Sequence, residues 1–101
     1  MKGMIDVTKY RPAVKIIMVL LECVERNQAK GRALKTRVIQ CAGMKTASAE
    51  KYLDILRDAG YIHERKEPWG ERNVIVYELT SLGRDRLEWF RKINAELFEN
   101  L

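Results

Sequence analysis

The chain has 101 residues, enough for one compact domain and too few for two. Hydrophobic residues make up 47% of it and charged residues 33%, the balance of a soluble globular protein. The longest apolar run, residues 16–21, is too short to cross a membrane, and no charged-then-apolar secretory leader is visible. We therefore expect a cytoplasmic protein that does not use a membrane as a partner.

The net charge of +5 is unevenly distributed. Seven cations and one acid lie between Arg26 and Lys51, so this segment carries +6 and the rest of the chain −1. A local excess of this kind is expected of a surface that meets a polyanion. A solvated basic face would have the same composition, so charge alone leaves both interpretations open.

The first half of the chain predicts two helices. Residues 1–11 have no firm period and form either a loose arm or a short strand. A helix is expected over residues 12–27, with proline in its first turn, and it is apolar nearly all round, so it should be covered on two sides. After a polar connection at residues 27–32, a second helix is expected over residues 33–42, ended by Gly43.

A third helix is expected from Thr46, as its N-cap, to Gly60. It carries two acids, Glu50 and Asp54, on positions away from its apolar stripe. The stripe that should face the core consists of Ala49, Leu53 and Leu56.

The pattern then changes to that of a hairpin followed by a long helix. Strands are predicted at residues 61–66 and 73–79, joined by a turn at residues 67–71 that contains Pro and Gly. Thr80 is a good N-cap for a last helix that reaches the C-terminus. The expected division is an arm (1–11), a core (12–79) and a C-terminal helix (80–101), all within one domain (1–101).

Two short segments add to this order of elements. The third helix ends in Tyr52-Leu53-x-x-Leu56-x-x-x-Gly60-Tyr61-Ile62, and the last helix begins in Tyr77-Glu78-Leu79-Thr80-Ser81-Leu82-Gly83-Arg84. In this order, with a Pro-Trp-Gly turn between them, they resemble the winged-helix DNA-binding superfamily. The chain looks most like the small MarR-like and archaeal dimeric regulators with a long C-terminal helix. The resemblance covers roughly residues 12–101.

The resemblance implies a mainly α fold with a small β-hairpin wing (α+β), a winged helix-turn-helix with a long C-terminal dimerisation helix. Its partner would be double-stranded DNA, with the third helix in the major groove and the wing beside it. Trp69 in the wing could wedge into the minor groove, stack on a sugar, or pack on the domain. The expected DNA contacts come from the basic segment and the wing and are Arg32, Lys35, Arg37, Lys45, Thr46, Ser48, Lys51, Arg65, Trp69 and Arg72.

The apolar surfaces of the first and last helices predict a homodimer. On the first helix, the second apolar face consists of Ile16, Val19, Leu20 and Cys23. On the last helix, the stripe consists of Leu82, Leu87, Phe90, Ile93, Leu97 and Leu101, and Trp89 and Phe98 widen it. The residues of this helix expected at the interface are Trp89, Phe90, Ile93, Leu97, Phe98 and Leu101. A two-fold dimer would cover both surfaces and would place two recognition helices about one DNA turn apart.

The sequence offers no constellation for catalysis. His63 is the only histidine, and Cys23 and Cys41 are scattered singly, so we expect no catalytic residue, metal site or cofactor. The two cysteines are interpreted as buried small hydrophobes, with an intermolecular disulfide left open for a hyperthermophilic source. The expected function is a transcriptional regulator without an identified small-molecule effector. Two alternatives remain, a winged-helix protein–protein interaction module and a nucleoid protein without sequence specificity.

Overall fold

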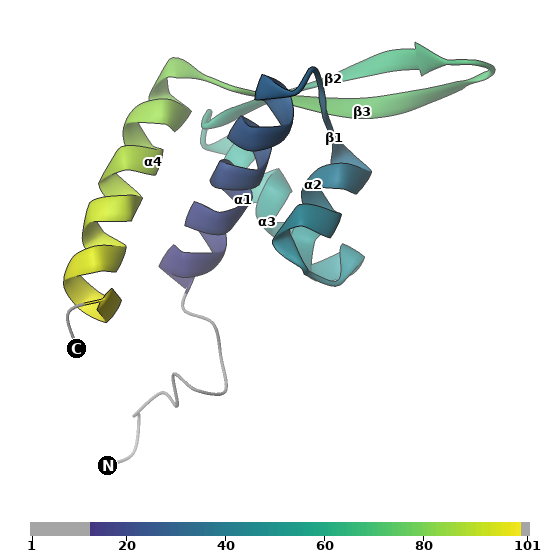
Figure 1. Cartoon of the computed structure of the whole chain (residues 1–101). Helices are drawn as coiled ribbons and strands as arrows, with labels where there is room; N and C mark the ends of the chain where they lie inside the picture. The colour runs from purple at the N-terminus through teal and green to yellow at the C-terminus, as the bar shows by residue number, and fades with distance from the viewer. Residues whose placement is uncertain (1–12, 100–101) are drawn as a thin grey trace.

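The computed structural model describes residues 13–99, and the arm expected at residues 1–11, Pro12 and Leu101 lie outside these described residues. Within them the chain forms four α-helices, a small antiparallel sheet and a final π-helical turn (Figure 1). The helices are α1 (Ala13–Ala29), α2 (Lys35–Ala42), α3 (Thr46–Asp58) and α4 (Ser81–Asn94), and the turn is η1 (Ala95–Glu99). The strands are β1 (Ala33–Leu34), β2 (Ile62–Trp69) and β3 (Arg72–Leu79). The expected mainly α fold with a hairpin wing is confirmed.

The sheet has the order β1-β3-β2, and each neighbouring pair is antiparallel. Strands β2 and β3 pair from Ile62↔Leu79 to Trp69↔Arg72 and form the wing, whose far end extends away from the helices (Figure 1). The turn is therefore only Gly70-Glu71, shorter than the predicted turn at residues 67–71. Gly70 has a φ of 64°, and its place as the first of two turn residues is typical of a type II′ hairpin.

Strand β1 was not expected. Its residues, Ala33 and Leu34, were assigned to the start of the second helix, but they pair with Tyr77 and Val76 of β3. A strand of two residues is too short to show an alternating pattern in the sequence. Strand β1 is therefore recognised only from its pairing with β3. This strand ties the connection between α1 and α2 to the wing.

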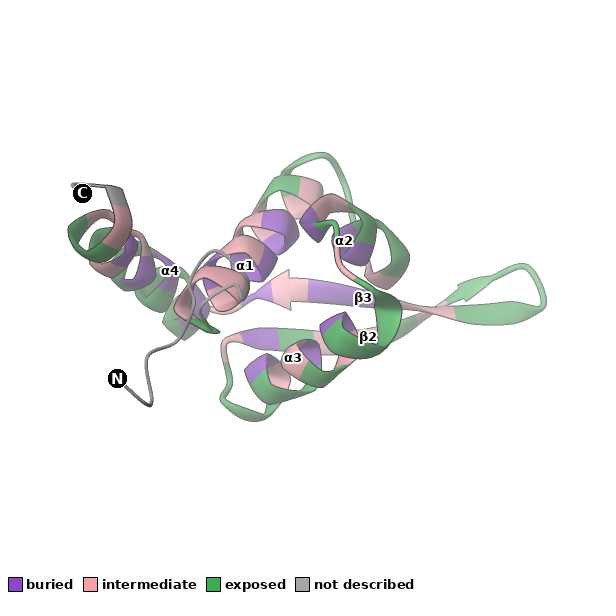
Figure 2. Cartoon of the chain, turned by 90° about the horizontal axis from the view of Figure 1, so that it is seen from below, coloured by how far each residue is buried: buried purple, intermediate pink, exposed green. Residues whose placement is uncertain are grey.

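The core lies between α1, α2, α3 and the sheet, and α4 packs on the other side of α1 (Figures 1 and 2). Figure 2 shows the buried positions on the inner sides of the helices and on the sheet, while the far end of the wing is exposed. Leu20 and Cys23 on α1 have 0% and 2% of their surface exposed. These two residues of the apolar second face of α1 are thus covered by their own chain, and the expectation that they face a partner is wrong.

The cysteines are joined to each other. Cys23 of α1 and Cys41 of α2 form an intramolecular disulfide, with their Cα atoms 5.8 Å apart. The interpretation of both as free hydrophobes is wrong, and so is the alternative of a bond between two chains. The bond fixes α2, the central helix of the basic segment, to α1.

Two helix ends follow the expected signals, and the start of α3 does not. Gly43 closes α2 in the left-handed region, with a φ of 65°. The Thr80 hydroxyl caps α4 by accepting a hydrogen bond from the Gly83 N–H at 2.9 Å. The exception is α3, whose N-cap is Lys45 rather than Thr46, without a side-chain hydrogen bond. None of the helices among residues 13–99 is long and apolar enough to cross a membrane.

Candidate nucleic-acid interface

Helix α3 buries one face and presents the opposite one to solvent. Its buried residues are Ala49, Leu53 and Leu56, the stripe that the sequence predicts. The exposed residues at the start and on the opposite face are Lys45, Thr46, Ala47, Ser48, Lys51, Asp54 and Ile55. The first turns of this face carry small side chains and two lysines, so another molecule can approach the backbone of α3 closely.

The predicted DNA contacts divide into free and engaged cations. Among the described residues, Arg37, Lys45, Lys51 and Arg72 are exposed and form no ion pair. The other three make internal ion pairs: Arg32 with Glu67 at 2.6 Å, Lys35 with Glu50 at 2.5 Å, and Arg65 with Glu67 and Glu78. The free cations lie at the start of α3, on α2 and at the end of the wing.

Glu50 and Asp54, two of the three acids of α3, form ion pairs with neighbouring cations. Glu50 is paired with Lys35 of α2, and Asp54 with Arg57 at 3.2 Å. Arg57 also binds Glu64 at 3.1 Å and Asp58 at 3.2 Å, and the hydrogen bond to Glu64 is the largest of several effects that raise the pKa of Arg57. Sequence analysis missed this cluster, because Glu64 reaches Arg57 only through the packing of α3 against β2. Lys35 thus offsets Glu50 near the start of α3, whereas the single charge of Arg57 is shared among three carboxylates near its end.

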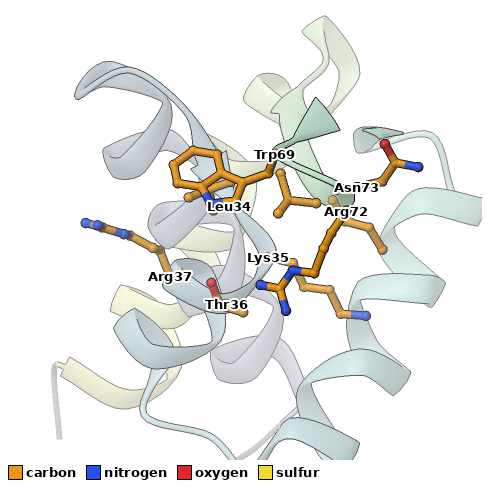
Figure 3. Close-up of a pocket in the computed structure, with 9 residues that line it drawn as sticks. Leu34, Lys35, Thr36, Arg37, Trp69, Arg72 and Asn73 are labelled. Carbon is orange, nitrogen blue, oxygen red and sulfur yellow. The ribbon is translucent and has the colours of Figure 1, made fainter. Parts of the chain in front are cut away.

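A groove of about 500 Å³ lies between the start of α2 and the wing (Figure 3). Its walls carry apolar and cationic side chains, namely Leu34, Lys35, Thr36, Arg37, Trp69, Arg72, Asn73, Val74 and Ile75. Trp69 is 50% exposed, and the guanidinium of Arg32 lies 5.2 Å from its ring centroid. Trp69 thus stands in the wall of a groove and not at the hairpin tip, which is formed by Gly70 and Glu71.

Helix α4 has two apolar faces. Leu87 and Phe90 are buried against the rest of the chain, together with Gly83 and Asn94. Phe90 is 7% exposed, so its expected place in a dimer interface is wrong. On the outer side, Leu82 and Trp89 of α4 and Leu97 of the following turn η1 are 38%, 52% and 51% exposed.

The other residues expected at a dimer interface are half-buried. Ile16 and Val19 on α1 pack partly against the core, while Ile93 on α4 and Phe98 on η1 keep part of their surface open. A hollow of about 450 Å³, lined by Tyr61, Arg86 and Trp89, indents the outer face of α4.

An ion-pair cluster holds α4 to α1. Arg91 binds Glu22 at 3.1 Å and Glu25 at 3.0 Å on α1, and Glu88 at 2.8 Å on its own helix. Burial lowers the pKa of Arg91, but these hydrogen bonds outweigh it and raise the pKa above its ordinary value. The orientation of α4, and of the apolar face that it exposes, is therefore fixed within the chain. No group of three or more His, Cys, Asp or Glu side chains within residues 13–99 could hold a metal ion.

Comparisons with known proteins agree with this architecture. Sso10a-2, a DNA-binding protein from Sulfolobus solfataricus, has a structure that matches with a TM-score of 0.64 at 29% sequence identity, over 89% of this chain and 88% of that chain. No curated protein sequence matches the chain. The similarity to Sso10a-2 does not single out the MarR-like regulators that the sequence resembles. A family model described as winged helix-turn-helix matches residues 10–97, and the chain therefore belongs to the winged helix-turn-helix family.

Proposed function

We propose that this protein binds double-stranded DNA, with α3 in the major groove and the wing beside it. The observation that carries the proposal is the exposed face of α3, on which Lys45 and Lys51 stand free of ion pairs with other described residues. In a winged helix this is the face that meets base edges and phosphates. The similarity to Sso10a-2, itself a DNA-binding protein, supports the same function.

The composition of α3 favours binding with little sequence preference. Direct readout of bases relies mainly on Arg, Asn and Gln, which form paired hydrogen bonds to guanine or adenine. Within α3 (Thr46–Asp58) the only residue of these types is Arg57, and three acids hold it. Lys51, Ser48 and Ala47 can contact phosphates, the edges of bases and thymine methyl groups. A nucleoid protein therefore fits this surface better than a regulator of a defined operator.

We further propose that the protein is a homodimer built on the outer face of α4. The residues Leu82, Arg86, Trp89, Ile93 and Leu97 follow each other at intervals of three or four residues on this face. A stripe of this spacing, with three large side chains more than a third exposed, is typical of a helix that packs against another helix. A two-fold arrangement would give the molecule two α3 helices for one duplex.

The proposed duplex binding is tested by titrating a fluorescent duplex of about two helical turns at two salt concentrations. Lys51→Ala and Lys45→Ala should each weaken binding and lower the salt slope by about one unit for each phosphate that the side chain no longer neutralises. Arg84→Ala is the matched control, because Arg84 is an exposed cation on α4, outside the proposed interface. Equal affinity of all three variants and the parent would rule out α3 as the interface.

A competition experiment then separates a regulator from a nucleoid protein. Unlabelled mixed-sequence DNA should displace a promoter fragment with nearly the same efficiency as the fragment itself. A preference for the fragment of about a thousandfold or more would instead assign the protein to the regulators.

A further inference from the structure

The groove between α2 and the wing combines a flat aromatic surface with free positive charge. Trp69 lines it together with apolar side chains from β1 and β3, among them Leu34 and Val74. Arg72 and Arg37 lie at the same groove and form no ion pair with another described residue. Figure 3 shows the Arg72 guanidinium reaching toward Thr36 at the start of α2, below the Trp69 indole, while Arg37 points outward.

The Trp69 ring is held in place by its neighbours. Arg32 lies over the ring at 5.2 Å and is itself fixed by Glu67 through a 2.6 Å ion pair. Arg65 binds the same carboxylate. A ring whose orientation is set by charged neighbours loses little freedom on binding a ligand, while half of its surface remains open to solvent.

The bases of paired DNA are not free to stack on the face of the Trp69 ring. In a duplex the faces of the bases are stacked on each other, so an aromatic residue reaches a base face only by wedging between two base pairs. Here the tip of the wing is the turn Gly70-Glu71, which contains an acid, and Trp69, directly before this turn, lines the groove beside α2. An unpaired base, in contrast, presents a free face that stacks on aromatic side chains.

We propose that this groove binds one unpaired nucleotide of a single-stranded nucleic acid. The base would stack on Trp69, and the adjoining phosphate would be held by Arg72, with Arg37 attracting the next phosphate. The volume of about 500 Å³ lies within the ordinary range for small-ligand sites. This binding mode does not require the duplex contact of α3, so the two proposals can fail separately.

The test measures binding of a fluorescent dT15 oligonucleotide by anisotropy, beside a duplex. Trp69→Ala should weaken dT15 binding roughly five- to hundredfold, because stacking on one aromatic ring is removed, and should weaken dT15 binding far more than duplex binding. Trp69→Phe, which keeps a ring, should recover most of the affinity, and Arg72→Ala should lower the salt slope for dT15 by about one unit. Lys51→Ala is the matched control, since it should weaken duplex binding and leave dT15 binding unchanged. Circular dichroism verifies that each variant is folded.

Fluorescence gives an independent readout of the ring itself. The chain has two tryptophans, so Trp89→Phe leaves Trp69 as the single reporter. Saturating dT15 should quench its emission, and dTMP alone should bind at least about tenfold more weakly than dT15, because the neighbouring phosphates are missing. Unchanged emission with bound dT15, or equal dT15 affinity for Trp69→Ala and the parent, would overturn the proposal. Equal affinity for dTMP and dT15 would overturn the single-strand assignment in favour of a free nucleotide.

Discussion

The ion pair between Lys35 and Glu50 shows how single residues decide the charge that α3 presents. Glu50 lies on the recognition helix, where a free carboxylate would repel DNA phosphates. Lys35 of α2 binds it at 2.5 Å, and both side chains remain partly exposed. The role that we propose for Lys35 is therefore to mask an acid, which differs from the direct phosphate contact expected from its position in the sequence.

Lys35→Ala should weaken duplex binding by about tenfold, because it removes a cation and also uncovers Glu50. The double variant Lys35→Ala/Glu50→Ala should recover most of this affinity. Anisotropy titrations of both variants at one salt concentration measure the difference. If the double variant binds as weakly as Lys35→Ala, Lys35 itself contacts the DNA and the masking role is wrong.

Tyr77 gives a prediction at alkaline pH. It is 1% exposed, and burial, assisted by the charge of Glu64, raises its pKa from 10.0 to about 12. The folded state therefore favours the neutral phenol, and the folded protein becomes less stable relative to the unfolded chain as the pH rises from about 10 to 12. The decrease can reach about 3 kcal/mol. Urea unfolding at about pH 9 and about pH 11 should show a larger decrease for the parent than for Tyr77→Phe, and equal decreases would contradict the prediction.

The Cys23–Cys41 disulfide should contribute to stability. It closes a loop between residues separated by 18 positions, and cross-links of this size stabilise small domains by about 3 kcal/mol. Reduced protein and the Cys23→Ala/Cys41→Ala variant should therefore unfold at lower urea concentrations than the oxidised parent. A mass shift of two hydrogens on reduction checks that the bond was present. An identical midpoint for the oxidised and reduced protein would show that the bond adds no stability.

At the scale of elements, the junction between α3, β2 and α4 depends on the absence of a side chain at Gly83. A Cβ atom there would lie 2.0 Å from the backbone oxygen of Tyr61, and backbone cannot move aside as a flexible side chain can. Gly83 also donates the hydrogen bond that caps α4. The close approach of α4 to the start of β2 therefore requires glycine at position 83.

Gly83→Ala should destabilise the protein by more than about 2 kcal/mol, although alanine is the better helix former by about 1 kcal/mol. Gly43→Ala is the matched control. No atom lies within 4 Å of a Cβ added at Gly43, so this substitution should lower the stability only by about 1 kcal/mol, the cost of placing alanine in the left-handed region. Urea denaturation of both variants measures the two costs. A Gly83→Ala protein as stable as the parent would exclude the tight junction.

The elements that sequence analysis predicted correctly are those with a strong local signal. The apolar period of α3 and the Gly43 and Thr80 end signals depend only on neighbouring residues, and all three are confirmed. Strand β1 depends on pairing with a segment far along the chain, and the Arg57 cluster depends on how β2 packs back against α3, so the sequence carries no periodic signal for either. The same holds for the disulfide, because two single cysteines do not reveal that α1 and α2 bring them together.

At the scale of the whole molecule, the two apolar faces of α4 explain why the predicted dimer surface was partly wrong. The sequence shows one broad stripe, but Phe90 belongs to the inner face and Trp89 to the outer face. Adjacent residues on a helix point about 100° apart, so only the position of α1 shows which of them is covered. Because the exposed apolar side chains lie on the outer face of α4, the proposed dimer interface is limited to that face.

Leu97→Glu and Trp89→Glu should each give folded monomers that bind DNA more weakly, because both side chains are about half exposed. Sedimentation equilibrium should report about twice 11.8 kDa for the parent and 11.8 kDa for the variants. Phe90→Glu serves as a contrast, since it should unfold the protein by placing a charge in the core. A parent that stays monomeric at micromolar concentration would exclude the dimer.

The order of strands in the sheet has a consequence for solubility. Among the described strands, β2 has a hydrogen-bonded neighbour on one side only, so its other side presents backbone groups that could pair with a foreign strand. Its sequence, Ile-His-Glu-Arg-Lys-Glu-Pro-Trp, places charges along this edge and a proline near its end. Charged side chains and proline are the devices by which proteins prevent edge-to-edge aggregation. The charged side chains and the proline of β2 should therefore hinder fibril-like self-association of this long, projecting hairpin, independently of any role in binding.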